Sequence, residues 1–246
     1  MHKRYYGLDL IRGLTFFSMV LYHALWDLVV LYDKKINWYT SAPGYVWQQS
    51  ICYTFIILSG FCWCFGHRKR NRSLLLLAAG GLITVVTTLF VPEGKIVFGI
   101  LTFLGAAALC LNLTEKLLRK CPAGFGMILS VLLFMVTRNV NTGTLGYESL
   151  HFLMVPRGFY RNWLTTFLGF PGAGFVSADY FSLIPWLFLY LFGYFLYRFS
   201  EGKGKLFGIL EKSRCKFFEK TGRYTLVLYL LHQPLLYGVF CLIPGL

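Results

Sequence analysis

Residues Tyr5–Tyr32 read YYGLDLIRGLTFFSMVLYHALWDLVVLY, and this stretch decides how the rest of the chain is interpreted. It is long and apolar enough to cross a bilayer as a helix, yet it contains Asp9, Arg12, His23 and Asp27. A helix turns by about 100° per residue, so the four side chains fall within roughly 60° of one another. Because ionisable groups are costly in hydrocarbon, they face a protein interior or a water-filled cavity. The stretch therefore predicts a first transmembrane helix whose polar stripe forms one wall of a site.

The composition excludes an ordinary soluble domain. Of 246 residues, 57% are hydrophobic and only 14% are charged, whereas soluble domains are near one quarter charged. The net charge of +14 lies in short runs between apolar segments, which is typical of the cytoplasmic loops of a membrane protein. We therefore expect no nucleic-acid partner. The seven cysteines show no metal-ligand spacing and are interpreted as packing residues, so no metal is expected.

Further apolar segments follow at the lengths that a membrane span requires. They predict an all-α, polytopic bundle of about seven transmembrane helices, in a single domain over residues 1–246. With the N-terminus in the cytoplasm, 18 of the 24 basic residues fall in inside loops and 6 in outside loops, which predicts N-in and C-out. The seven segments are Leu8–Leu31, Tyr45–Gly66, Ser73–Val91, Ile96–Leu113, Phe125–Val140, Phe181–Phe199 and Tyr224–Ile243.

Two loops and two prolines add detail. The outside loop at residues 141–180 is rich in aromatic residues and is expected at the outer mouth of the bundle or at the membrane interface. The inside loop at residues 200–223 is basic and amphipathic, which fits a surface helix on anionic lipid or a phosphate-binding rim. Pro185 and Pro234 predict two broken helices, since proline removes a backbone donor. Broken helices with polar residues at depth are where membrane proteins bind substrates.

His23 is the leading catalytic candidate, because an imidazole exchanges a proton near neutral pH. Asp27 lies one turn away and would orient that ring. Arg12, near the cytoplasmic end, would grip a phosphate, with Asp9 beside it. The structural alternatives are a neutral histidine satisfied within the bundle and an Arg12 that anchors topology or pairs with Asp9. His232 either lines the same cavity or caps the carbonyl that Pro234 frees.

Five stretches, in this order along the chain, resemble bacterial members of the heparan-alpha-glucosaminide N-acetyltransferase catalytic-domain family, within a broader transmembrane acyltransferase superfamily. The resemblance covers essentially the whole chain. The stretches are LDLIRGLTFFSMVLYHALWDL (Leu8–Leu28), FIILSGF (Phe55–Phe61), VFGILTFLG (Val97–Gly105), DYFSLIPWLFLYLFG (Asp179–Gly193) and GRYTLVLYLLHQPLL (Gly222–Leu236).

The resemblance implies an acyltransferase of the bacterial cytoplasmic membrane that moves an acyl group, often acetyl, from cytoplasmic acyl-CoA to a hydroxyl or amine of a glycan or lipid-linked acceptor. The expected partners are membrane lipid, the small-molecule acyl donor and that acceptor, and a homo-oligomer is left open. His23 is carried over from the bacterial pattern, since the eukaryotic heparan enzyme has asparagine there. The candidates are His23 and Asp27 for catalysis, Arg12, Asp9, Arg68 and Arg70 for acyl-CoA, Ser59, Thr102, Trp186, His232 and Gln233 for the lining, and Asp179, Arg157 and His151 for the acceptor side.

Two other functions remain open at this point. The same polar stripe would suit a transporter or a proton-coupled permeation pathway, although no inverted repeat is visible in the sequence. A non-catalytic membrane partner is the third reading. It is kept open by Thr102, at a position where bacterial relatives commonly carry histidine.

Overall fold

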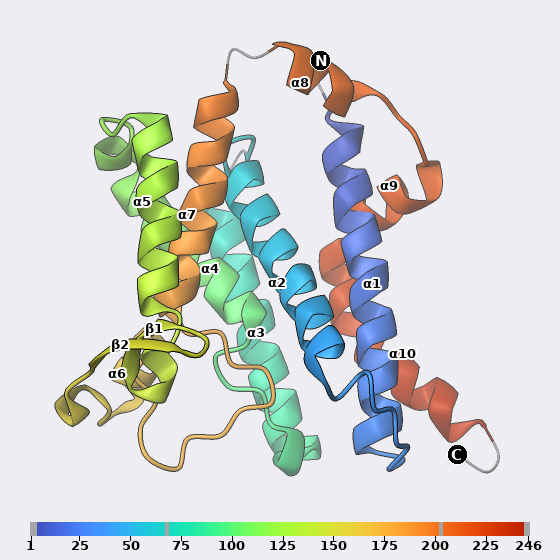
Figure 1. Cartoon of the computed structure of the whole chain (residues 1–246). Helices are drawn as coiled ribbons and strands as arrows, with labels where there is room; N and C mark the ends of the chain where they lie inside the picture. Colours follow the sequence, from blue (N-terminus) through green and yellow to red (C-terminus); the bar gives the residue numbers. More distant parts are fainter. Residues whose placement is uncertain (1–3, 67–68, 202–203, 244–246) are drawn as a thin grey trace. The chain divides into compact units, whose positions relative to one another are not determined.

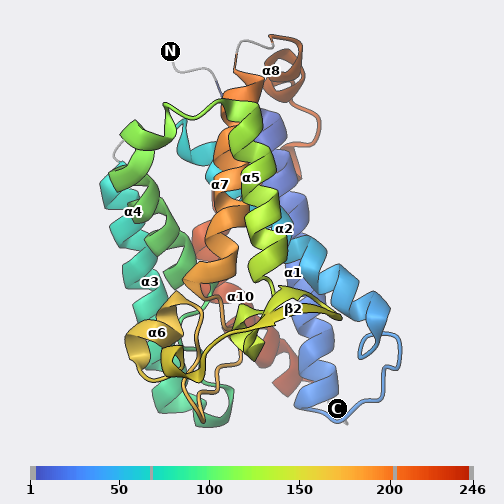
Figure 2. The same ribbon diagram turned by 60° about the vertical axis from the view of Figure 1, so that its left-hand side comes forward.

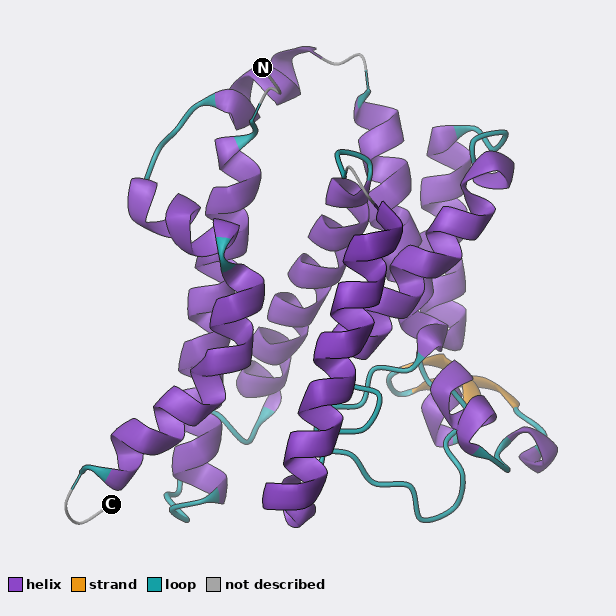
Figure 3. Ribbon diagram, turned by 180° about the vertical axis from the view of Figure 1, so that it is seen from behind, coloured by secondary structure: helices purple, strands orange, loops and turns teal. Residues whose placement is uncertain are grey.

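The computed structural model describes residues 4–66, 69–201 and 204–243, and helices dominate them (Figure 1). The all-α prediction is confirmed. Strands are confined, among these residues, to one hairpin, which Figure 3 shows in orange. The helices are α1 (Tyr6–Val30), α2 (Ala42–Trp63), α3 (Lys69–Phe90), α4 (Ile100–Leu118), α5 (Ala123–Thr137), α6 (Trp163–Leu168), α7 (Leu183–Ser200), α8 (Gly204–Glu211), α9 (Lys216–Arg223) and α10 (Thr225–Cys241). The strands are β1 (Thr144–Tyr147) and β2 (Leu150–Met154), and the short 3-10 turns are η1 (Pro92–Gly94), η2 (Val140–Thr142) and η3 (Arg157–Phe159).

A helix occupies each of the seven predicted apolar segments, namely α1 to α5, α7 and α10. Within the described ranges, five helices are long and apolar enough to cross a membrane: α1, α3, α4, α5 with its continuation to Thr142, and α7. A sixth span results if α9 and α10, which meet at an angle of 90°, count as one. The chain is therefore a polytopic membrane protein, and the count of seven is not confirmed. Of the seven predicted segments, α2 is in neither set, and it carries two consecutive glutamines, Gln48 and Gln49.

The chain divides into two compact units, and each is described by itself. The first comprises Met1–Leu58 and Ser200–Leu246, and the second comprises Ser59–Phe199. The single-domain organisation stays a prediction.

In the first unit, α1 is the central element. Its apolar residues Phe16 and Met19 form a core with Ile51 of α2. The indole N–H of Trp47 donates to the hydroxyl of Ser18 at 2.8 Å, which fixes α2 against α1. The loop at residues 200–223 forms α8 and α9, and α9 packs against α1.

Helices α1 and α10 run parallel. Phe16 of α1 lies against His232, whose ring centroid is 6.4 Å away, and two turns of α10 later Phe240 lies against Tyr32 at 5.7 Å. The start of α1 and the end of α10 therefore lie at opposite ends of this unit, and the N-in and C-out orientation stays a prediction. Pro234 does not break the helix, because α10 continues through it. The sharp bend instead falls at Tyr224, between α9 and α10.

In the second unit, α3 and α4 pack through small residues. A Cβ atom on Gly80 would lie 2.4 Å from the hydroxyl oxygen of Thr102, so the two helices approach closely there. Helix α7 contains the kink that Pro185 predicts, with Ile184 in a non-helical conformation. At the other end of α7, the guanidinium of Arg198 donates to the carbonyls of Leu118 and Cys121.

The outside loop of this unit is ordered by a hairpin that the sequence analysis does not predict. Strands β1 and β2 pair antiparallel, with a bulge after Leu145. The side-chain amide of Asn139 donates to the carbonyls of Glu148 and Leu150 and so holds the hairpin at the end of α5. Figure 2 shows the hairpin and α6 together at this end of α5 and α7.

Candidate functional site

Ionisable and amide side chains gather where α1 packs on α10, in the first unit. The ring of His23 lies edge-on to the ring of His232, with centroids 5.0 Å apart. One turn further along α1, the side-chain amide of Gln233 donates to the Asp27 carboxylate at 2.6 Å. Two contacts between polar side chains, one turn apart along α1, thus connect α1 with α10.

Asp27 is fully buried, with no exposed side-chain surface. Its Oδ1 atom accepts from Gln233, and its Oδ2 atom has no hydrogen-bond partner among the described residues. The carboxylate therefore does not hold the ring of His23 through a hydrogen bond. The sequence suggests that Asp27 orients the ring of His23. In the structure Asp27 instead pairs with Gln233 of α10.

The tautomer of His232 follows from its own helix. Nδ1 lies 2.5 Å from the carbonyl oxygen of Tyr229, and a carbonyl can only accept, so Nδ1 carries the proton. In the neutral ring Nε2 is then an acceptor, and it is buried without a partner within the described chain. His232 is thus a base whose lone pair is held in a fixed direction.

Three buried polar side-chain atoms at the contact between α1 and α10 have no hydrogen-bond partner among the described residues. They are Oδ2 of Asp27, Nε2 of His232 and Oε1 of Gln233. Buried polar groups are nearly always hydrogen-bonded, and each exception calls for an explanation such as an unseen water or a catalytic role. All three atoms are acceptors, and together with His23 they form what we call the α1–α10 polar cluster.

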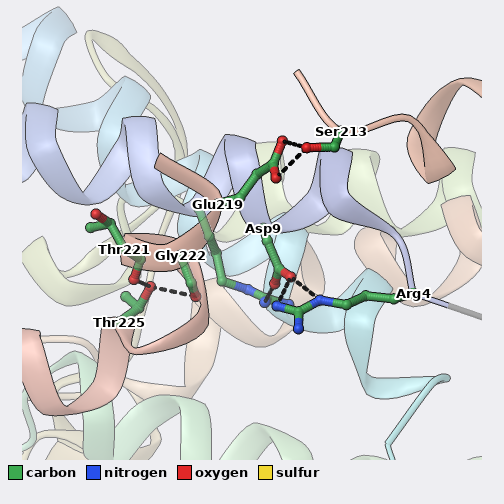
Figure 4. Close-up of polar contacts among 8 residues, drawn as sticks. Arg4, Asp9, Ser213, Glu219, Thr221, Gly222 and Thr225 are labelled. Carbon is green, nitrogen blue, oxygen red and sulfur yellow. Dashed lines mark hydrogen bonds and ion pairs between the residues drawn. The ribbon is translucent and has the colours of Figure 1, made fainter. Parts of the chain in front are cut away.

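Charged residues form a second group near the N-terminal end of α1 (Figure 4). Asp9 accepts from Arg4 through Nη2 at 2.7 Å and from Arg12 through Nη1 at 3.0 Å. Asp9 thus bridges two guanidinium groups. A guanidinium has five N–H donors, so Arg12 retains donors for an anion while Asp9 fixes its position.

Helix α9 crosses α1 at this group of charged residues, and the two backbones are in contact there. A Cβ atom on Gly13 would lie 1.9 Å from the carbonyl oxygen of Phe218, and one on Gly222 would lie 1.8 Å from that of Asp9. Glycine is therefore required on both helices at the crossing. Thr225 donates its hydroxyl to the Gly222 carbonyl at 2.8 Å, which fixes the turn into α10 (Figure 4).

Glu219 of α9 holds the loop that precedes α9. Its carboxylate accepts from the hydroxyl of Ser213 at 2.8 Å (Figure 4). It also accepts from the backbone N–H groups of Arg214 and Cys215. Glu219 therefore fixes α9, and through it the N-terminal end of α1.

The comparisons with known proteins decide the family. The family model described as heparan-alpha-glucosaminide N-acetyltransferase, catalytic, matches residues 4–234. The chain belongs to this family. No curated protein and no solved structure matches the chain.

Membership in the heparan-alpha-glucosaminide N-acetyltransferase family points to a membrane acetyltransferase, and the family in general uses acetyl-CoA as its donor. The matched region contains both groups described above, because it reaches from Arg4 to Pro234. The matched region ends one residue after Gln233. It therefore includes the part of α10 that carries His232 and Gln233.

Other predicted residues of this acetyltransferase-family chain lie in the second unit. Ser59 is half-buried near the end of α2, and Thr102 faces Gly80 of α3. Trp186 is buried in an aromatic core, with its ring 4.9 Å from that of Phe181 and 5.7 Å from that of Phe134. The structure gives Thr102 and Trp186 packing roles, and the assignment of all three residues to the site stays a prediction.

The predicted basic rim is described only in part. Arg68 lies outside the described residues, and Arg70 is exposed in the first turn of α3. Among the described residues, no group of three His, Cys, Asp or Glu side chains could hold a metal ion.

The acceptor-side residues lie on the outside loop of the second unit. His151 is exposed on β2, with Nδ1 2.9 Å from the hydroxyl of Thr144, and Arg157 is exposed in η3. Asp179 caps α4, since its Oδ2 accepts from the backbone N–H of Ile100 at 3.1 Å. Burial raises the pKa of the Asp179 carboxyl to about 6.

Sequence reasoning missed Arg4, Glu219 and Gly222 as members of the site. Gly222 is the first residue of the stretch GRYTLVLYLLHQPLL, and Glu219 lies three residues before it, so the start of this motif is the signal that could have found both. Arg4 gives no comparable signal, because it lies in a short basic run before the apolar segment.

Proposed function

We propose that this chain transfers an acetyl group from cytoplasmic acetyl-CoA to a hydroxyl or amine of a glycan or lipid-linked acceptor, with the chemistry at the α1–α10 polar cluster. The observation that carries the proposal is the set of three buried acceptor atoms without partners beside His23. In a family whose reaction removes a proton from an acceptor, a fixed and unoccupied base is the group that the reaction needs.

His232 is proposed as the base. Its Nε2 takes the proton of the acceptor O–H or N–H while the acceptor atom attacks the carbonyl carbon of the thioester. The C–S bond then breaks, and the thiolate of coenzyme A takes the proton back from His232. His23 borders the same space and supplies a ring N–H to the carbonyl oxygen as it becomes negative. Gln233 and Asp27 keep α10 in register with α1, so that the two rings face each other.

The donor is proposed to bind from the inner end. Arg12 retains guanidinium donors for the phosphates of coenzyme A, while Asp9 and Arg4 hold Arg12 in place. Along the α1 axis, Arg12 and His23 are separated by about 16 Å. The narrow pantetheine arm would cover that distance alongside α1 and present the thioester to the two histidines.

The test compares His232→Ala and His23→Ala with a control on the same helix as His232, Tyr237→Ala, whose side chain is exposed. The protein is purified in detergent and given acetyl-CoA with glucosamine as the acceptor probe, and the release of the coenzyme A thiol is measured. Loss of a general base typically costs about 10²–10⁴-fold in rate, so His232→Ala is expected to fall by at least about 100-fold. The Tyr237 variant should keep the parental rate.

Donor binding separates catalysis from folding. Acetyl-CoA should raise the midpoint of thermal unfolding of His232→Ala as much as that of the parent protein, because ligand stabilisation depends on affinity and not on turnover. Transfer at the parental rate by His232→Ala would show the assignment to be wrong. If all variants bind acetyl-CoA but none transfers to any acceptor, the proposed reaction itself fails.

A further inference from the structure

The outside loop of the second unit exposes an unusual amount of apolar surface. Every residue of β2 is exposed, including Phe152 at 63% and Met154 at 77% of their surface. Trp163, which begins α6, is 66% exposed. Large exposed apolar patches on a protein mark a surface that another phase or partner covers. We call residues 150–164 the outer apolar segment.

The segment is held at the level where two membrane spans end. The hydroxyl of Tyr160 donates to the carbonyl of Val140 at 2.6 Å, directly after α5. The side-chain amide of Asn141 donates to the hydroxyl of Ser182 at 3.1 Å, directly before α7. Since α5 and α7 are both long and apolar enough to cross a membrane, the segment lies at the ends of two candidate spans (Figure 2).

The side chains of the segment are fixed by their neighbours. The ring of Trp163 rests against the rings of Phe98 and Phe175, with centroids 6.0 and 6.1 Å away. The side chain of Asn162 accepts from the backbone N–H of Thr165 and caps α6. The apolar side chains are therefore held in place and cannot fold away from solvent. Their exposure to water would cost hydrophobic free energy.

The side-chain pattern on β2 favours contact with lipid acyl chains over contact with a protein partner. Successive side chains of a strand point to opposite faces, so Phe152 and Met154 share one face and Leu153 points to the other. All five residues are exposed: Leu150, Phe152 and Met154 make one face wholly apolar, and Leu153 lies beside His151 on the other. A docked protein would cover one face, whereas acyl chains surround both.

The charge of the segment complements phosphate. Between residues 149 and 178 the chain contains two arginines, Arg157 and Arg161, and no acidic residue. Both arginines are exposed. Aromatic and apolar side chains beside arginine are typical of segments that lie in the membrane interface, with the ring buried and the guanidinium at the headgroups.

We propose that residues 150–164 form a lipid anchor at the outer surface of the membrane, with Phe152, Met154 and Trp163 among the acyl chains and Arg157 and Arg161 on phospholipid phosphates. This anchor goes beyond the acetyltransferase function. It fixes the outside loop against the bilayer at the ends of α5 and α7.

The test places the full chain in nanodiscs that contain a phospholipid with a photoreactive diazirine near the glycerol end of its acyl chain, and maps the cross-linked peptides by mass spectrometry. A second lipid with the diazirine near the chain end labels the spans, where exposed residues of α3 such as Val85 report that the protein is folded and embedded. The peptides with residues 150–154 and 163–164 should be labelled by the first lipid and not by the second.

Two variants sharpen the result. Phe152→Ser with Leu153→Ser should lose labelling of β2 while labelling of α3 stays unchanged. Arg157→Gln with Arg161→Gln should reduce the preference for anionic over zwitterionic nanodiscs by roughly tenfold, since each interfacial arginine contributes independently to anionic lipid binding. An unlabelled segment beside a labelled α3 would overturn the proposal, and so would cross-links between two copies of the segment in place of lipid.

Discussion

Gln233 on α10 donates a hydrogen bond of 2.6 Å to Asp27 on α1, across two helices whose other contacts are largely apolar. The bond sets the rotation and the register of one helix against the other. With Asp27 and Gln233 paired, the preceding residue of α10, His232, faces His23. The two histidines are brought together by a pairing that neither of them makes.

The first prediction concerns this pairing. Gln233→Leu removes the donor and leaves a fully buried carboxylate without a hydrogen bond. An unsatisfied buried polar group costs about 1–3 kcal/mol, more for a charge, so the midpoint of thermal unfolding in detergent should fall. Because both helices belong to the same unit, the loss should be visible in the unfolding of that unit.

The double variant Asp27→Leu/Gln233→Leu is the control. Replacing both partners with apolar groups removes the desolvation cost together with the hydrogen bond, so the stability should return close to that of the parent protein. A loss in the double variant that equals the sum of the losses of Asp27→Leu and Gln233→Leu measured singly would contradict the pairing, because the effects would then be additive and independent.

The second prediction concerns donor binding. Arg12→Gln should raise the KM for acetyl-CoA by roughly 10–100-fold, since a hydrogen bond to a charged group contributes about 1.5–3 kcal/mol. The matched control is Arg4→Gln, which removes the other cation on Asp9 and should change KM far less. Equal effects of the two substitutions would mean that both act only through Asp9.

The third prediction tests the helix crossing. Gly222→Ala forces a Cβ atom to within 1.8 Å of the Asp9 carbonyl oxygen, a backbone atom that can move only with α1. We expect a loss of at least about 1–3 kcal/mol in unfolding free energy, as for other overpacked sites. Gly238→Ala on α10 meets no atom within 4 Å and should be neutral or slightly stabilising, as measured by thermal unfolding.

The fourth prediction uses two adjacent glycines of α3. A Cβ atom on Gly80 would clash with the backbone nitrogen and hydroxyl of Thr102, while one on Gly81 would meet nothing within 4 Å. Gly80→Ala should therefore separate α3 from α4 and lower stability, whereas Gly81→Ala should gain about 0.5–1 kcal/mol from helix propensity. Thermal unfolding of the two variants decides, and similar values would mean that the helices do not pack there.

The polar stripe of α1 was predictable because it depends on two things that act within one helix. They are the helical period and the free-energy cost of placing charged side chains in lipid. Asp9, Arg12 and Asp27 lie on a shared face of α1, and charges in an apolar helix must turn inward. The partner of Asp27 was not predictable, because it depends on how two helices are rotated against each other. Pro234 was expected to break α10, but membrane helices tolerate proline where neighbours satisfy the freed backbone groups. Strand β2 was missed because a short apolar run inside an aromatic loop gives no alternation to read.

The last prediction concerns pH and the cap of α4. Burial raises the pKa of Asp179 to about 6 in the folded protein, against an ordinary value of 3.8. Between these two values the folded state holds more protons than the unfolded state, so stability falls as pH rises from about 4 to about 6 and is flat above that window. Asp179→Asn keeps an oxygen for the backbone N–H of Ile100 but does not titrate. Its unfolding midpoint should lose this part of the pH dependence, as measured by thermal unfolding at a series of pH values. A parent protein and an Asn variant with the same slope across the window would show that the carboxyl is solvated and titrates normally.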